Sequence, residues 1–180
     1  MKFLIIFLLF YSSTPELKNN KIKMPLEIIV YNMIAATKSG YIQRKTDCVL
    51  KYSKQYNLDV IIFTKLGIAE SSFQHNKTNP DSGAVGIYGI MPKYWKHLCY
   101  YVLNGKYKNY LHKNKGTNYM KVMHFIAANT EMGAIILSTY LKKYNGDYRL
   151  ALIQYGGWRA KKFKHRLKER DKYLEKILGE

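Results

Sequence analysis

The chain has 180 residues, of which 47% are apolar and 23% are charged. A chain of this length forms one domain that buries roughly two thirds of its unfolded surface, which excludes a second catalytic domain, and its composition excludes disorder throughout. Its 30 Lys and Arg against 12 Asp and Glu give a formal charge of +18. This excess favours association with a polyanion such as nucleic acid, anionic lipid or cell wall, and it is equally typical of a lysine-rich soluble surface.

The amino terminus has the pattern of a secretory signal. Met1-Lys2 precedes the apolar run Phe3–Phe10, which is too short for a comfortable membrane span. We predict a signal-like apolar segment over residues 1–11, a polar linker over 12–25 and the folded domain over 26–180. No clean small-x-small cleavage site follows the apolar run, so an uncleaved anchor and an ordinary buried segment both stay open. We expect an exported protein of the periplasm, the cell envelope or the medium.

The rest of the chain predicts a series of helices and no run of alternating strands. The expected helices are Leu26–Thr37, Thr46–Tyr56, Val60–Ser71, about Tyr119–Tyr144, Tyr148–Tyr155 and Arg159–Leu178. Asp59 is placed as an N-cap of the third helix. The apolar residues expected to face the core in the last helix are Phe163, Leu167, Leu174 and Ile177. The expected fold class is mainly α with little or no β.

The two cysteines, Cys48 and Cys99, would form a bridge worth on the order of 3 to 4 kcal/mol in an oxidising compartment. Two free thiols fit the sequence equally well, because the Cα separation decides between them. Neither cysteine has metal-site spacing, and the histidines at 75, 97, 112, 124 and 165 are scattered. We therefore predict no metal.

Glu70 stands in the stretch Val60–Ser71, which is apolar nearly all round and is typical of a helix surrounded by protein. Helical spacing places it on the same face as Ile62, Phe63 and Leu66. Desolvation on such a face raises the pKa of a carboxyl toward neutrality, which a general acid for a glycosidic bond requires. A structural glutamate paired with an arginine or with helix-end amides explains this helix equally well.

The residues that follow Glu70 favour the acid. Glu70-Ser71-Ser72-Phe73 and the run Ser-Gly-Ala-Val-Gly-Ile-Tyr-Gly-Ile-Met-Pro over 82–92 resemble the first two motifs of lytic transglycosylases, the family that includes the goose-type lysozyme fold. Three further elements of that family follow in order: Asn129 with Gly133 and Leu137, then Ala151–Gly157, then Arg170–Ile177. The resemblance spans about Tyr56 to Tyr173. It implies a lysozyme-like helical domain.

The resemblance also implies a peptidoglycan lytic transglycosylase without a cofactor. Most glycosidases use two carboxylates, but near Glu70 the sequence offers only Asp81, and then none until Glu131. In this family one glutamate protonates the leaving oxygen of the MurNAc-GlcNAc β-1,4 bond and then removes a proton from the C6 hydroxyl of muramic acid. The sugar attacks itself and ends as a 1,6-anhydromuramoyl unit, so that proximity replaces the second carboxylate.

The same match implies roles around the catalytic Glu70. The predicted substrate-binding residues are Ser71, Gly86, Tyr88, Tyr155 and Tyr173. The three tyrosines are expected to line a groove, offering a ring to a sugar and a hydroxyl toward Glu70. Gly86 lets the backbone turn tightly, whereas Ser71 is alternatively a simple polar residue at a helix end. Phe73 is expected to pack in the core, and Asn129 to cap or brace the helix behind the site.

Two positions depart from the family pattern. Gly89 stands where the family has a substrate-holding Gln, and Gly156 stands where it has Asn. Each lost contact is worth on the order of 1 kcal/mol, so these changes weaken or reshape a subsite. The segment Lys93–Met120 is longer than the family usually carries, and it is either a wall-binding or specificity loop or a plain surface insertion.

Three functions therefore stay open. The first is a lytic transglycosylase that serves wall remodelling, a secretion or conjugation apparatus, or phage lysis. The second is a goose-type lysozyme hydrolase in which Asp81 positions a water molecule. The third is a non-catalytic protein that binds glycan or a polyanion. We expect peptidoglycan glycan strands as the partner, no specific nucleic acid, and a monomer.

Overall fold

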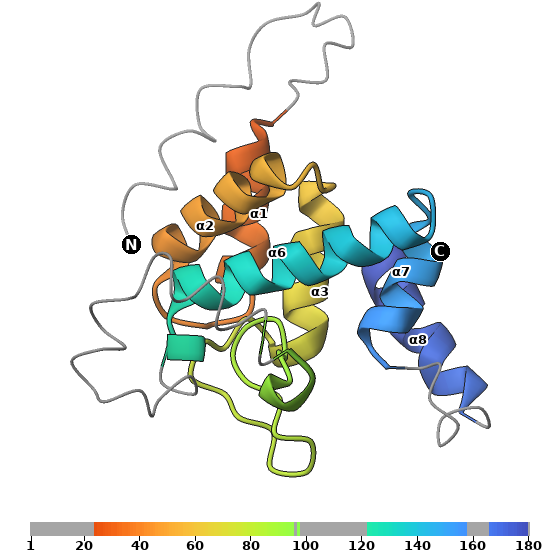
Figure 1. The fold of residues 1–180 in the computed structure, drawn as a ribbon. Coiled ribbons are helices and arrows are strands. Elements are labelled where there is room, and N and C mark those ends of the chain that lie inside the picture. Colours follow the sequence, from red (N-terminus) through yellow and green to blue (C-terminus); the bar gives the residue numbers. More distant parts are fainter. Residues whose placement is uncertain (1–23, 96, 98–121, 158–165, 180) are drawn as a thin grey trace, which may run out of the picture.

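The computed structural model describes residues 24–95, 97, 122–157 and 166–179. Its helices with defined bounds are α1 (Leu26–Ala35), α2 (Ile42–Gln55), α3 (Val60–Ser71), α6 (Ile126–Lys143), α7 (Tyr148–Tyr155) and α8 (Leu167–Leu178) (Figure 1). Strand-like pairing in the described residues is limited to isolated bridges, which Val85 makes with Thr78 and with Ile90. The prediction of a mainly α, lysozyme-like fold is confirmed.

Two predicted helices have the expected bounds, namely α3 and α7. Both begin at an aspartate whose side chain accepts a hydrogen bond from the backbone three residues on: Asp59 from Ile62 and Asp147 from Leu150, each at 2.9 Å. These caps satisfy backbone N–H groups that a helix start leaves free, which explains why the sequence marks the two starts clearly.

Three helices, α2, α6 and α8, begin at other residues than predicted. Helix α2 begins at Ile42 rather than Thr46, after a Tyr41 in the left-handed conformation with no side-chain cap. Helix α6 begins at Ile126, because the helical residues 122–123 are followed by a turn and an extended Phe125. In the last predicted helix, α8 begins at Leu167, and residues 158–165 lie outside the described part.

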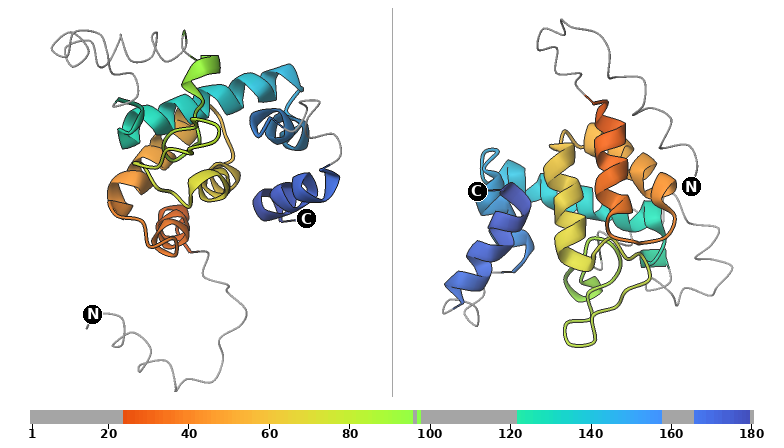
Figure 2. Two further views of the ribbon diagram at one scale, coloured as in Figure 1. Left: turned by 90° about the horizontal axis from the view of Figure 1, so that it is seen from below. Right: turned by 180° about the vertical axis from the view of Figure 1, so that it is seen from behind.

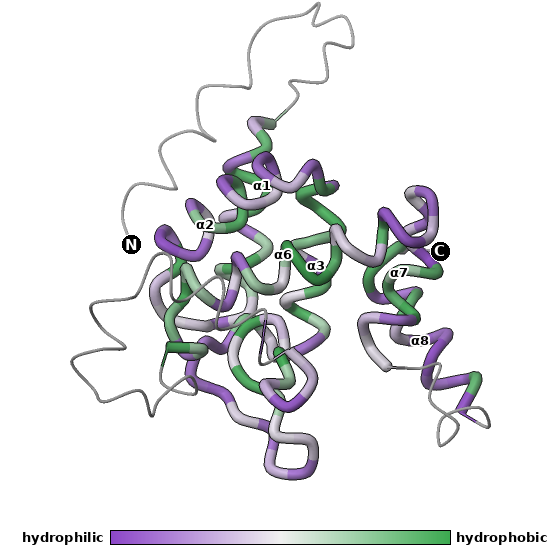
Figure 3. Tube along the Cα trace, viewed as in Figure 1, coloured by the Kyte–Doolittle hydropathy of each residue, from purple (hydrophilic) through white to green (hydrophobic). Residues whose placement is uncertain are grey.

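Helix α3 lies at the centre of the packing. It contacts α1 and α2 on one side and α8 on the other, while α6 contacts α2 and α7 (Figures 1 and 2). Figure 3 shows α3 as mostly hydrophobic along its length. Its Phe63 and Leu66 are fully buried, as expected for a helix that protein surrounds.

The chain turns sharply where α3 ends. Ser72 and Phe73 both have positive φ, at 54° and 60°, and they lead into a loop that runs to Met91. Phe73 is fully buried, as expected for a packing residue. Its ring lies so close to Gly67 that a Cβ there would be 2.6 Å from Phe73 Cε2. Gly67 therefore lets the loop fold back onto α3.

Several predictions fall on residues outside the described part. The signal-like segment over residues 1–11 and the linker up to residue 23 are among them, and the domain boundaries stay a prediction. In the part that the structure describes, no helix has both the length and the apolar character needed to cross a bilayer. Cys99 also lies outside the described residues, and Cys48 carries a free thiol.

Candidate active site

A cleft of about 800 Å³ lies at the C-terminal end of α3, where Glu70 reaches it from the last turn of the helix. The loop after α3 contributes Lys77, Asn79 and Gly86 to its lining, among others. Residues that directly follow this loop also line the cleft, and α6 and the end of α7 contribute further residues, including Tyr140 and Tyr155. The cleft therefore gathers side chains from four separate parts of the chain around one carboxyl group.

Glu70 is half-buried and borders this cleft. The hydroxyl of Tyr173 in α8 donates a hydrogen bond to Glu70 Oε1 at 2.7 Å. Burial raises the pKa of Glu70 from 4.5 to about 7, although the Tyr173 hydrogen bond and the positive charge of Lys176 pull it down. In the described residues its hydrogen-bond partner is thus a tyrosine rather than an arginine. A carboxyl with this pKa can both give and take a proton near neutral pH.

The other carboxylates of the described residues do not line the cleft. Glu70 is the one acidic residue among the described residues that line the cleft. Asn79 and Ser82 belong to the lining, but Asp81 between them does not. Glu131 is buried in α6 and accepts a hydrogen bond from the Tyr56 hydroxyl at 3.2 Å. No group of three His, Cys, Asp or Glu residues in the described part is placed to hold a metal ion.

Asn129 of α6 holds the loop in shape. Its Oδ1 accepts from the Tyr88 backbone at 2.9 Å, while its Nδ2 donates to the carbonyls of Val85 at 2.9 Å and Met123 at 3.0 Å. Gly86, with φ of 74°, packs directly on the Asn129 amide, and a Cβ there would clash with it. Asn129 therefore braces the loop behind the site, and Gly86 is required both for its φ and for the close approach.

Gly89 lies directly against the acid. Its φ is 56°, and a Cβ added to it would lie 2.7 Å from Glu70 Oε2. In this backbone conformation, the family's usual Gln would press on the carboxyl. Gly156 and Gly157 also line the cleft, so three glycines leave room near Glu70.

The three predicted groove tyrosines have different places. Tyr155 lines the cleft and its hydroxyl donates to the Tyr88 carbonyl at 2.9 Å, while Tyr173 holds Glu70. Tyr88 is fully buried, with its ring stacked on Phe63 at 4.3 Å between centroids. The predicted groove position of Tyr88 is therefore wrong. The missing Cβ of Gly133 in α6 makes room for this ring in the core.

Ser71 borders the cleft but is only 2% exposed. Its hydroxyl donates to the Ile87 carbonyl at 2.8 Å and accepts from the Gln74 backbone at 3.1 Å. The side chain thus ties the end of α3 to the loop. A contact between Ser71 and the substrate stays a prediction.

A comparison with protein-family models matches residues 47–176 to the transglycosylase SLT domain. The chain belongs to this family. The match contains Glu70, Asn129, Tyr155 and Tyr173, and it confirms the resemblance to lytic transglycosylases. Membership assigns the chain to the glycan-cleaving transglycosylases that act on peptidoglycan. Searches of curated proteins and of solved structures find no match.

Some aromatic residues in the cleft of this SLT domain were not predicted from the sequence. Tyr94 and Trp95 line it, and the Trp95 ring meets Tyr140 edge to face at 5.9 Å between centroids. Two adjacent aromatic residues, one position beyond the Met91-Pro92 end of the second motif, were a usable signal. Tyr140 had none, because it is one of 17 tyrosines and its position depends on how α6 packs.

Proposed function

We propose that this SLT domain is a lytic transglycosylase that cleaves the MurNAc-GlcNAc β-1,4 bond of peptidoglycan, with Glu70 as acid and then as base. The observation that carries the proposal is a single carboxyl at the cleft with its pKa raised to about 7. Such a group can donate its proton in one step and recover a proton in the next. Because peptidoglycan lies outside the cytoplasmic membrane, the proposal includes export of the protein.

In the first step, protonated Glu70 gives its proton to the glycosidic oxygen as the bond from that oxygen to the muramic acid C1 breaks. The leaving sugar then carries a new hydroxyl, and positive charge develops at C1. Glu70 is now a carboxylate, and the Tyr173 hydroxyl at 2.7 Å from Oε1 stabilises it by donating a hydrogen bond.

In the second step, the Glu70 carboxylate removes the proton from the C6 hydroxyl of the same muramic acid. The C6 oxygen bonds to C1 and closes the 1,6-anhydro ring. Glu70 is protonated again and no water is consumed. The nucleophile belongs to the sugar that is being cut, so its proximity supplies what a second carboxylate would otherwise provide.

The arrangement favours this reaction over hydrolysis. An inverting hydrolase needs a second carboxylate to activate water across the sugar. Asp81, the candidate for that role, is not among the described residues that line the cleft, and Glu131 is buried in α6. Gly86, Tyr155 and Ser71 are the proposed substrate neighbours that border the cleft. Association with a secretion or conjugation apparatus and a monomeric state stay predictions.

Digestion of purified sacculi by the wild type and by Glu70→Gln tests the proposal. Mass spectrometry of the released muropeptides should show 1,6-anhydromuramoyl ends from the wild type, with a rate at least about 100-fold lower for the variant. Reducing ends would instead support the hydrolase. Equal release by both proteins would show that Glu70 takes no part in the reaction, and no release by the wild type would contradict an enzymatic function.

A further inference from the structure

Tyr94 and Trp95 form an aromatic part of the cleft lining that lies outside the acid chemistry. Tyr94 is 68% exposed, and Lys93 Nζ lies 5.9 Å from the centroid of its ring. Trp95 is partly buried and its ring is supported edge to face by Tyr140 of α6. Both residues line the same cleft as Glu70.

Backbone hydrogen bonds hold both residues, and α6 supports the ring of Trp95. The backbone N–H groups of Tyr94 and Trp95 both donate to the Met91 carbonyl, at 3.0 and 3.2 Å. The contact with Tyr140 anchors Trp95 to a long helix of the core. A supported ring loses little conformational entropy when a ligand binds, so the Trp95 ring is preorganised for a flat partner.

The exposure of Tyr94 indicates what that partner is. A large aromatic ring at a cleft leaves apolar surface in contact with water, and covering this surface is favourable. A pyranose ring in a β-1,4-linked strand presents C–H groups on a flat face and hydroxyl groups at its edge. A tyrosine or tryptophan ring matches the flat face, while the Tyr hydroxyl and the indole N–H can bond to the edge.

We propose that Tyr94 and Trp95 form a sugar-stacking platform that binds a pyranose ring of the glycan strand away from the bond being cut. The proposal rests on the proposed function, in that it takes a peptidoglycan glycan strand as the ligand. Binding at a sugar remote from the reacting bond helps to place that bond against Glu70.

Calorimetric titration of the inactive Glu70→Gln protein with peptide-free glycan strands from sacculi tests the platform. Adding Tyr94→Ala should weaken binding roughly tenfold, since truncating an aromatic residue at a contact commonly costs this much. Tyr94→Phe should retain most of the affinity. Tyr41→Ala is the matched control, because Tyr41 is 66% exposed and is not among the described residues that line the cleft, and it should bind normally.

Tryptophan fluorescence gives a second, independent readout. The chain has two tryptophans, Trp95 and Trp158, so a Trp158→Phe protein reports on Trp95 alone. Glycan strands should shift its emission to shorter wavelength as water leaves the ring. Unchanged emission during binding, unchanged affinity after Tyr94→Ala, or no binding by any variant would each overturn the platform. Because these measurements use the inactive protein, a failure of wild-type cleavage would contradict the proposed enzyme and leave Tyr94-dependent binding intact.

Discussion

Glu70 is subject to two opposing effects in the folded protein. Burial disfavours its charged form, whereas the Tyr173 hydroxyl and the Lys176 charge favour that form, and the outcome is a pKa of about 7. A stronger hydrogen-bond network would leave the group permanently charged, and greater burial without Tyr173 would leave it permanently neutral. Either change would remove one of the two proton transfers.

This balance predicts a pH-dependent stability difference between the wild type and Glu70→Gln. Because the pKa of Glu70 is higher in the folded protein than its ordinary 4.5, the unfolded chain loses this proton first as pH rises, and the wild type loses stability between these two values. A rise from 4.5 to about 7 corresponds to about 3 kcal/mol. Urea unfolding should therefore show that the variant gains up to about 3 kcal/mol relative to the wild type between about pH 4 and pH 8. A stability difference that does not change with pH would contradict the burial of this carboxyl.

Tyr88 and Tyr155 predict opposite results for the same substitution. The Tyr88 hydroxyl is buried and has no hydrogen-bond partner among the described residues, so Tyr88→Phe should keep activity and add up to about 1 kcal/mol of stability. Tyr155→Phe removes the bond to the Tyr88 carbonyl, next to Gly89 and Glu70, and should cost about 1 kcal/mol and lower the cleavage rate. Denaturant unfolding and release of muropeptides measure both. A large loss of activity in Tyr88→Phe would indicate that the Tyr88 hydroxyl contributes to substrate binding after all.

At the scale of the elements, the loop between α3 and Met91 depends on a helix far along the chain. Asn129 bonds two loop residues and also the carbonyl of Met123, which lies at the break before α6. One amide side chain thus fixes the loop and the start of α6 together. The position of Gly89 against Glu70 follows from this brace.

Asn129→Ala should therefore destabilise the protein by roughly 3 kcal/mol, because it removes three buried hydrogen bonds to backbone groups. Asn32→Ala, at an exposed position in α1, is the control and should stay within about 0.5 kcal/mol of the wild type. Thermal and denaturant unfolding measure the two variants. Equal stability of both would show that the loop keeps its shape without the Asn129 amide.

The same elements show how far sequence could predict the structure. Helices α3 and α7 were predictable because Asp59 and Asp147 mark their starts locally. The break before α6 was not, because it involves a hydrogen bond from Asn129, a side chain of the helix that follows, to the Met123 carbonyl. Likewise, Leu167 is 52% exposed rather than in the core, since it stands at the first residue of α8, while Leu174 and Ile177 are buried as predicted.

The candidate site also combines features that the sequence could predict with features that it could not. Glu70 was predictable from its apolar helix and from a motif, and Tyr173 from a motif, although the two residues are 103 positions apart. The burial of Tyr88 was not predictable, because the space for its ring comes from Gly133 on another helix. Local patterns thus identified Glu70, the proposed acid, whereas packing between helices decided which tyrosines reach the cleft.

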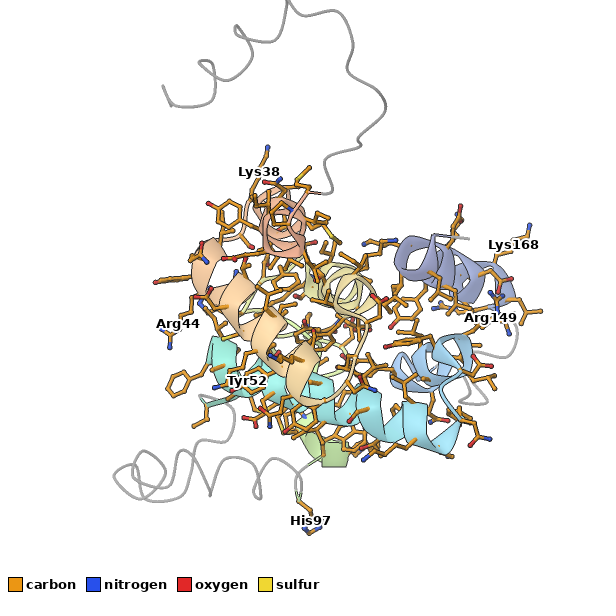
Figure 4. The ribbon with its side chains drawn as sticks, turned by 90° about the horizontal axis from the view of Figure 1, so that it is seen from above. Lys38, Arg44, Tyr52, His97, Arg149 and Lys168 are labelled. Carbon is orange, nitrogen blue, oxygen red and sulfur yellow. The ribbon has the colours of Figure 1, made fainter. Side chains whose placement is uncertain are left out.

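At the scale of the whole molecule, the formal net charge is +18. Figure 4 shows the labelled Lys38, Arg44 and Lys168 at the edge of the molecule, pointing outward. Lys45 is fully buried, and burial lowers its pKa to about 8. Like charges in this excess repel one another in the folded state and attract an anionic wall.

Salt should therefore act on stability and on wall binding in opposite directions. Raising the salt concentration from about 0.02 to about 0.2 M screens the repulsion and should raise the melting temperature. The same change should weaken sedimentation of the inactive Glu70→Gln protein with anionic sacculi. Calorimetry and pelleting assays measure the two effects. Wall binding that is indifferent to salt would show that the charge plays no part in it.

The position of Glu70 in the last turn of α3 has a consequence for turnover. Aligned peptide dipoles give the C-terminal end of a helix a partial negative charge, and Glu70 belongs to the last turn at this end. A carboxylate formed there is repelled by the backbone that presents it, so the helix itself favours the return of a proton. In the proposed reaction, the fold would thereby help to restore the protonated acid after each cleavage through the orientation of a helix rather than through an additional side chain.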